Sequence, residues 1–244
     1  MNTNYLLFDI RRTMRNRRVM IFSILMPLVL FLIFGTNLKG QSMNDGMSSA
    51  AYVMISMAMF GSMSAAMSIG GAIAIERDGG WNRTLRLTPL RPRSYLLSKV
   101  LLSLALAVPP IVSVFLVAVL GADVRMGAGD WTTVALTAWL GALPFAGIGL
   151  IIGYLAKPDS VQPISGLVTI LVAAFGGLWV PIQNMPSLMK HIAEITPAYW
   201  TGLTARSPLT HTGFDSKALL VVLGWTVLLG LIGLRRFQAD TARA

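Results

Sequence analysis

The sequence predicts an all-α, polytopic membrane protein with six transmembrane helices. Charged residues make up only 12% of the 244 residues, and the mean hydropathy is +0.67. The charges are spaced so that six stretches of 20, 30, 23, 26, 30 and 17 residues contain none. A helix needs roughly 20 apolar residues to cross a bilayer core. Six such stretches predict six spanning helices, a pattern that a soluble domain of this length does not show.

We expect one transmembrane domain, residues 1–244. The expected spans are residues 19–38, 50–75, 99–121, 131–155, 161–182 and 218–234. The first apolar run, residues 19–35, is longer than the apolar region of a signal peptide, and no clear A-x-A site follows it. We therefore expect it to stay as a membrane anchor. The chain has no cysteine, which excludes disulfides and cysteine-ligated metal sites.

The distribution of basic residues predicts the orientation. With six spans, residues 1–18, the charged stretch 75–100, the turn near 157–163 and the C-terminal tail share one side. That side carries 15 of the 20 basic residues, whereas the ten acids divide equally. The 15 are Arg11, Arg12, Arg15, Arg17, Arg18, Arg77, Arg83, Arg86, Arg91, Arg93, Lys99, Lys157, Arg235, Arg236 and Arg243. The positive-inside rule makes this side, and both termini, cytoplasmic. Membrane orientation thus explains the net charge of +10 without nucleic-acid binding.

Residues 1–18 predict an amphipathic, basic helix before the first span. Leu6, Leu7, Ile10 and Met14 follow the helical spacing of one apolar face. Such a helix tends to lie in the membrane interface with its arginines near anionic headgroups. Two interpretations stay open, a plain topology signal and an interface helix that leads force into the first span.

The second span combines small residues with methionines. A small residue recurs every four positions, at Ser62, Ala66, Gly70 and Ala74. This spacing lets another helix approach closely. Methionines form a second stripe at Met59, Met63 and Met67. The stripes fit ordinary helix packing, and they equally fit an apolar lining that contacts a substrate or a moving helix.

The later spans contain helix-breaking residues. Pro109 and Pro110 are expected to kink the third span. Gly149 and Gly153 give the fourth span a GxxxG spacing. The short segment 157–163 is expected to turn the chain into the fifth span.

The extracellular loop, residues 183–217, is expected to hold a helical hairpin before the last span. Gly176, Gly177 and Pro181 interrupt the fifth span, and residues 187–195 read as a short amphipathic helix. Tyr199 and Trp200 suit anchors at headgroup level. The hairpin either re-enters the membrane or lies on its surface.

The sequence lacks the motifs of an enzyme. It has no GxxxxGK[ST] motif for ATP and no HExxH, and its two histidines, His191 and His211, lie in the outer loop. No acid or base lies in the middle of a predicted span, which argues against a proton-coupled pump. Sodium coupling through backbone oxygens stays open. The chain is therefore expected to provide a transport path and to take its energy from elsewhere.

The most charged stretch is "IERDGGWNRTLRLTPLRPRSYLLSKV", residues 75–100. Glu76 and Arg77 continue the second span, and Gly79-Gly80 end it. A second short helix, residues 81–87, is expected to stop before Pro89. We expect Glu76 to pair with Arg77, Arg83 or Arg86. The alternative is a merely topogenic loop whose arginines contact lipid headgroups.

This stretch carries a family resemblance. Glu76-Arg77, Gly80 and "RTLRLTPLRPRSYLLSK", then "KPDSVQP" at 157–163 and "WVPIQNMPSLMKHIAEITPAYW" at 179–200, resemble the ABC-2 family of ABC transporter permeases, in its bacterial drug and antibiotic exporter branch. The resemblance implies a subunit of the bacterial inner or plasma membrane that forms a homodimer, or a heterodimer with a sister permease. It implies two copies of a separate ABC ATPase, which bind ATP and Mg, and no cofactor in this chain.

The resemblance also implies a function and candidate residues. The complex would export a hydrophobic or amphipathic substrate, such as a drug, an antibiotic or a lipid-like molecule. The loop 76–98 would couple the chain to the ATPase through Glu76, Arg77, Gly80, Trp81, Arg83, Leu85 and Arg86. The substrate path or the dimer interface would include Met54, Met57, Gly61, Met63, Phe175 and Trp179. The alternatives are an ATP-independent secondary transporter or channel, and a membrane enzyme or lipid-handling protein.

Overall fold

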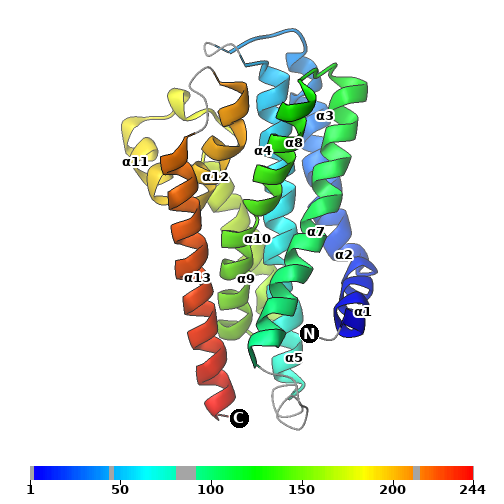
Figure 1. The fold of residues 1–244 in the computed structure, drawn as a ribbon, viewed down its shortest axis with the longest axis vertical. Helices are drawn as coiled ribbons and strands as arrows, with labels where there is room; N and C mark the ends of the chain where they lie inside the picture. The colour runs from blue at the N-terminus through cyan, green and yellow to red at the C-terminus, as the bar shows by residue number, and fades with distance from the viewer. Residues whose placement is uncertain (1–2, 44–46, 81–91, 211–214, 244) are drawn as a thin grey trace.

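The computed structural model describes residues 3–43, 47–80, 92–210 and 215–243. These residues form a bundle of long helices, with the helix α1 crosswise near one end and a short hairpin, α11 and α12, near the other (Figure 1). In the described part of the chain, six helical segments are long and apolar enough to cross a membrane. They are Ile21–Leu38, Ser49–Asp78, Ser94–Gly121, Ala128–Leu155, Pro158–Phe175 and Ser216–Asp240. The predicted six-span, all-α architecture is confirmed.

The first span begins after two short helices. Helix α1 is Thr3–Met14, and α2 is Arg17–Met20. A π-helical turn, Ile21–Leu25, leads into α3, Met26–Phe34, and a 3₁₀ turn, Thr36–Leu38, ends the span. A π turn widens the backbone locally by one residue per turn, which rotates the side chains that follow it.

The second span is the central helix of the bundle (Figure 1). It comprises α4, Ser49–Met67, and α5, Ile69–Asp78, which meet at Ser68. Its most apolar window is 78% buried by the rest of the chain, against 22% for the first, fifth and sixth spans. A helix that is apolar on every side belongs inside a bundle. The methionines of this span therefore lie in the core of the protomer.

Small residues bring α5 into backbone contact with the fourth span. That span comprises α8, Ala128–Leu140, and α9, Leu143–Leu155. A Cβ atom added to Gly70 would lie 2.5 Å from the carbonyl oxygen of Gly149, and one added to Gly153 would lie 2.7 Å from that of Gly70. Only glycine permits this approach. The close approach expected at Gly70 of the second span and at the GxxxG spacing of the fourth span is confirmed.

The third and fourth spans differ in how they tolerate proline. Helix α7, Pro92–Gly121, is continuous through Pro109 and Pro110, and it begins seven residues before the expected span 99–121. The fourth span instead breaks at Gly141–Ala142, and Pro144 opens α9. A proline in the first turn of a helix needs no backbone donor, so it favours a new start there.

The fifth span, α10, is Pro158–Phe175 and ends at Gly176. Gly177 has a φ of 74°, which suits glycine, and the chain then folds back through a 3₁₀ turn, Ile182–Asn184. Helix α11, Ser187–Ile195, has the bounds that the sequence predicts. Helix α12, Pro197–Arg206, and a 3₁₀ turn, Ser207–Leu209, complete the hairpin. The last helix, α13, is Ser216–Arg243 and continues past the expected end at 234.

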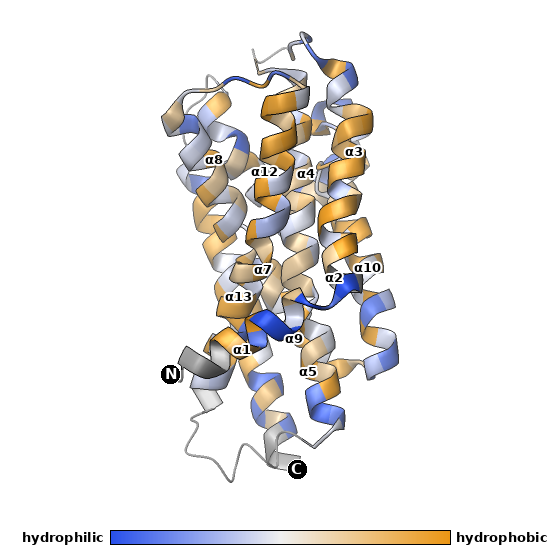
Figure 2. Ribbon diagram, turned by 90° about the vertical axis from the view of Figure 1, so that its right-hand side faces the viewer, coloured by the Kyte–Doolittle hydropathy of each residue, from blue (hydrophilic) through white to orange (hydrophobic). Residues whose placement is uncertain are grey.

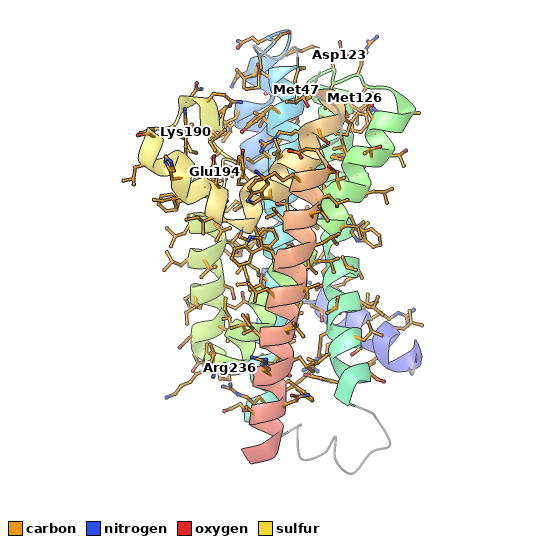
Figure 3. All side chains as sticks on the ribbon, turned by 60° about the vertical axis from the view of Figure 1, so that its left-hand side comes forward. Met47, Asp123, Met126, Lys190, Glu194 and Arg236 are labelled. Atoms are coloured by element: carbon orange, nitrogen blue, oxygen red, sulfur yellow. The ribbon has the colours of Figure 1, made fainter. Side chains whose placement is uncertain are left out.

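The outside of the bundle is apolar. The long helices expose large hydrophobic side chains, such as Ile33 (52%), Leu116 (57%), Leu167 (59%) and Val227 (60%). Figure 2 shows this apolar surface along the helices, with polar residues gathered at the ends. Lys190 and Glu194 lie near one end and Arg236 near the other (Figure 3). A surface of this kind fits a lipid environment, and the chain is a multi-pass membrane protein. We call the end that holds α1, the end of α5 and the C-terminus the basic end.

Candidate functional site

A buried lysine joins three helices at the basic end. The Nζ atom of Lys99, on α7, lies 2.8 Å from Oδ2 of Asp9 on α1 and 2.7 Å from Oε1 of Glu76 on α5. The lysine side chain is fully buried, and the side chains of Asp9 and Glu76 are 6% and 11% exposed. A buried charge is tolerated only when it is paired and hydrogen-bonded. We call Asp9, Glu76, Lys99 and the neighbouring Tyr95 the ion cluster.

Tyr95 completes the coordination of Glu76. It lies one helical turn before Lys99 on α7, so both side chains project from the same face. Its hydroxyl group donates a hydrogen bond of 2.6 Å to Oε2 of Glu76. Both carboxylate oxygens of Glu76 are therefore held by α7. The Lys99 ammonium also lies 5.3 Å from the centre of the Tyr95 ring, within cation–π range.

The expected pairing of Glu76 with an arginine is wrong for Arg77. Its guanidinium group instead donates hydrogen bonds to the carbonyl oxygens of Tyr154 and Ala156, the latter at 2.8 Å. Successive helix residues point about 100° apart, so Arg77 faces α9 while Glu76 faces α7. There it satisfies carbonyl groups at the C-terminal end of α9, where a cation is favoured. Arg83 and Arg86 lie outside the described residues.

The last helix reaches the ion cluster through aromatic contacts. Phe237 on α13 is 1% exposed. Its ring stacks on Tyr95, with centroids 5.8 Å apart, and meets Tyr154 edge to face at 5.9 Å. Sequence reasoning ended the span at 234 and missed this residue. The sequence does carry a signal for it: a large aromatic residue directly follows Arg235-Arg236. A helix that only leaves the membrane at these arginines needs no aromatic residue there.

The ion cluster and its neighbours connect α1, α5, α7, α9 and α13 at one level. The connections begin at Glu76 and Arg77, the last turn of α5. Gly79 then caps this helix, and Gly80, with a φ of 72°, ends it as expected. Because the three charges are engaged with one another, the arrangement is suited to holding helices in register. Among the described residues, no group of three His, Cys, Asp or Glu side chains is placed to hold a metal ion.

The other predicted coupling residues, Trp81, Arg83, Leu85 and Arg86, lie outside the described part of the chain. Their proposed contact with an ATPase stays a prediction.

The residues predicted for a substrate path or dimer interface fall into two groups. Met54, Met57 and Met63 are buried inside the protomer, with at most 3% of each exposed. Gly61 lies against Pro110 of α7. Phe175 is half-buried, and Trp179 is 39% exposed and meets Phe60 edge to face, with ring centroids 5.7 Å apart. In this conformation only Phe175 and Trp179 reach the outer surface of the chain.

A second buried cation lies at the opposite end. The Nε atom of Arg206, at the end of α12, donates a hydrogen bond of 3.0 Å to the Gly202 carbonyl. Its Nη1 atom lies 3.5 Å from both Ser56 Oγ and the Gly177 carbonyl oxygen, and its guanidinium group lies 4.5 Å from the centre of the Tyr52 ring. The sequence places Arg206 only within the expected extracellular loop, residues 183–217. Nothing in its local sequence indicates burial, because its partners come from two other segments.

Tyr52 strengthens this outer connection. Its hydroxyl group donates a hydrogen bond of 2.6 Å to the Gly177 carbonyl oxygen. The turn after α10 is thus tied to both α4 and α12. Nearby, burial raises the pKa of Tyr199, and the Glu194 carboxylate adds to this rise.

Comparison with known proteins agrees with this architecture. The family model described as ABC-2 type transporter matches residues 6–208. The chain is also 29% identical over 233 residues to the "Putative transport permease YvfS" of Bacillus subtilis (strain 168), which covers 94% of this chain and 95% of that protein. The family match includes α5, α7, α9 and the hairpin. The chain therefore belongs to the ABC-2 type transporter family.

Proposed function

We propose that this chain is the permease subunit of an ABC exporter. A separate ABC ATPase, in two copies, would bind ATP and Mg, and this chain would contribute the membrane path without a cofactor of its own. The basic end would face the cytoplasm of a bacterial cell. The ion cluster is the observation that carries this proposal, because its Glu76 lies in the last turn of α5, the helix that leads in sequence to residues 81–91, which would dock on the ATPase.

The geometry supports a role in transmitting force. A displacement of the segment 81–91 acts first on the last turn of α5. There Glu76 is bonded to α7 and, through Lys99, to α1, while Arg77 is bonded to α9. Packed elements with specific polar contacts shift between discrete arrangements, so a push at this point moves several spans together.

The proposed cargo is a hydrophobic or amphipathic molecule, such as a drug, an antibiotic or a lipid-like compound. The supporting observation is the methionine-rich central span, since methionine side chains adapt to apolar surfaces of varied shape. Because Met54, Met57 and Met63 are buried in the protomer, their exposure would require the spans to separate during the cycle. We propose that this occurs in a dimer, with itself or with a sister permease, and that Gly61, Phe175 and Trp179 border the same path.

The test is to purify the tagged chain in mild detergent with its ATPase and to reconstitute the complex. We expect Glu76→Gln to keep the complex and its ATP hydrolysis but to lose most ATP-driven export, because Lys99 and Tyr95 lose a charged partner. Asp78→Asn is the matched control, since Asp78 lies two residues away and is exposed.

Two results would contradict the proposal. Full export by the Glu76→Gln complex would remove the coupling role of the ion cluster. Transport by the chain alone, with no ATPase in preparations that keep it folded, would instead favour the ATP-independent transporter or channel.

A further inference from the structure

Among the side chains of helix α1 that the structure describes, most of the apolar ones face away from the bundle. Leu7 and Phe8 are 56% and 67% exposed, and Met14 is 42% exposed. Asp9, in contrast, is 4% exposed and faces Lys99, and Ile10 packs partly buried against α7. A buried ion pair fixes α1 to the bundle, and its apolar face is directed outward. This arrangement indicates that something other than the bundle contacts the outer face of α1.

The same helix and the turn after it carry exposed cations. Arg11, Arg12, Arg15 and Arg17 are all exposed. In the described part of the chain none of these four lies within ion-pair distance of a carboxylate, so their charge is directed outward. Exposed arginines beside exposed apolar groups are the two features that bind a helix to an anionic lipid surface.

The position of α1 favours lipid over a protein partner. It lies crosswise to the long helices, at the level of Lys99 (Figure 2). Figure 1 shows α5 and α13 continuing beyond α1, away from the centre of the bundle. A protein that docks at the end of α5, Asp78, lies past the level of α1. The plane of α1 is therefore suited to contact with the surface of a bilayer.

We propose that α1 binds the phosphate groups of anionic phospholipids in the cytoplasmic leaflet, and that this contact sets how firmly Asp9 holds Lys99. The effect on transport rests on the proposed function above, whereas the lipid contact does not. Because Lys99 is shared by two carboxylates, a shift of Asp9 changes the hold of Lys99 on Glu76. The negative charge of the leaflet thereby regulates the joint between α5 and α7.

The lipid contact can be measured without any ATPase. The chain has no cysteine, so Phe8→Cys provides a unique site for a spin label. The labelled chain is placed in nanodiscs of phosphatidylcholine, alone or mixed with phosphatidylglycerol. We expect phosphatidylglycerol to lower the label's mobility and to increase its depth, and high salt to weaken this shift by screening.

Matched variants separate specific binding from general attraction. Arg11→Gln, Arg12→Gln and Arg15→Gln together should abolish the shift. Arg235→Gln with Arg236→Gln should preserve it, because these exposed arginines lie on α13 and not on α1. Identical spectra of the unsubstituted chain with and without phosphatidylglycerol would overturn the proposal.

Transmission is tested by the amount of substrate moved per ATP in the reconstituted complex. We expect this ratio to depend on phosphatidylglycerol, and Asp9→Asn to remove the dependence while the label at position 8 still responds. A ratio of substrate moved per ATP that does not depend on the lipid, while the label responds, would overturn the regulatory link and leave the proposed function intact.

Loss of the ATPase from the triple arginine variant in every lipid would also overturn the regulatory link, and would make α1 a protein-docking element. ATP-independent transport would refute the proposed function alone, since the label experiment would still report lipid binding.

Discussion

Lys99 is a single cation between two carboxylates, and its burial makes the balance of charges decisive. Neither carboxylate can turn to water without breaking a bond at 2.7 or 2.8 Å. The cost of removing such a lysine arises mainly from the anions that it leaves behind. The ion cluster should therefore respond very differently to single and to combined substitutions.

We predict that Lys99→Met lowers the free energy of unfolding by about 3–5 kcal/mol, the range found when one partner of a buried pair is removed. Combining it with Asp9→Asn and Glu76→Gln should recover much of this loss, because no unpaired charge stays buried. Thermal unfolding in detergent measures both. Lys157→Met, at an exposed lysine near the same end, is the control. A triple variant no more stable than Lys99→Met would contradict the charge-balance explanation.

Arg206 differs from Lys99 because its contacts are neutral. In the described residues no carboxylate lies within ion-pair distance of it, and the bonds run to backbone carbonyls and Ser56. Arginine suits this position because its planar group reaches several acceptors at once. These hydrogen bonds must offset the cost of burying the guanidinium group.

We predict that Arg206→Lys destabilises the hairpin by about 1–3 kcal/mol, since a lysine cannot reach Gly202 and Gly177 together. The measurement is hydrogen exchange across α12 and the turn at 176–178. Arg125→Lys, at an exposed arginine, should leave this exchange unchanged. Equal protection in Arg206→Lys would show that the cation does not hold the hairpin.

At the scale of elements, the sequence predicts the spans well because their signal is local. Each charge-free stretch is long enough for one crossing, and residues 187–195 carry the periodicity of α11 within nine positions. The partner of Glu76 could not be predicted in this way. It depends on the rotational phase of α5 and on α7 beginning at Pro92, which brings Lys99 two turns into a helix. The burial of Asp9 by α7 is likewise set by tertiary packing.

The crossing of α5 and α9 supplies a prediction about packing. We expect Gly70→Leu to destabilise the protein by about 1–3 kcal/mol or more, because its side chain would push into the backbone of Gly149. Thermal unfolding in detergent is the measurement. Gly166→Leu on α10 is the control, as no atom lies within 4 Å of a Cβ there. Unchanged stability of Gly70→Leu would refute the close approach.

The end of α13 at the basic end supplies another prediction. Phe237→Ala removes a fully packed ring, so we expect the last turns of α13 to fray and trypsin to cut faster at Arg235 and Arg236. Val227→Ala, an exposed position on the same helix, serves as the control. Equal cleavage rates would mean that Phe237 does not anchor this end to Tyr95 and Tyr154.

At the scale of the whole molecule, the two ends differ in charge, and this predicts the orientation in the cell. We expect a membrane-impermeant maleimide to label Lys190→Cys on intact cells and to label Arg236→Cys only after lysis. Each variant carries a single cysteine, because the chain has none. The reverse pattern would invert the assignment of the basic end to the cytoplasm.

The breaks at Ser68 and at Gly141–Ala142 also have a consequence for the whole protomer. Between them and the basic end, α5 and α9 touch backbone to backbone at Gly70 and Gly149 and are bonded again where Arg77 meets Ala156. Because α5 and α9 are joined at two points along their length, we expect them to move as one rigid pair, about 15–20 Å long at 1.5 Å per residue. We expect bending of these two helices to concentrate at the two breaks. A small rotation at Glu76 would then move this rigid pair as a whole and displace its far end, next to the methionine-rich helix α4.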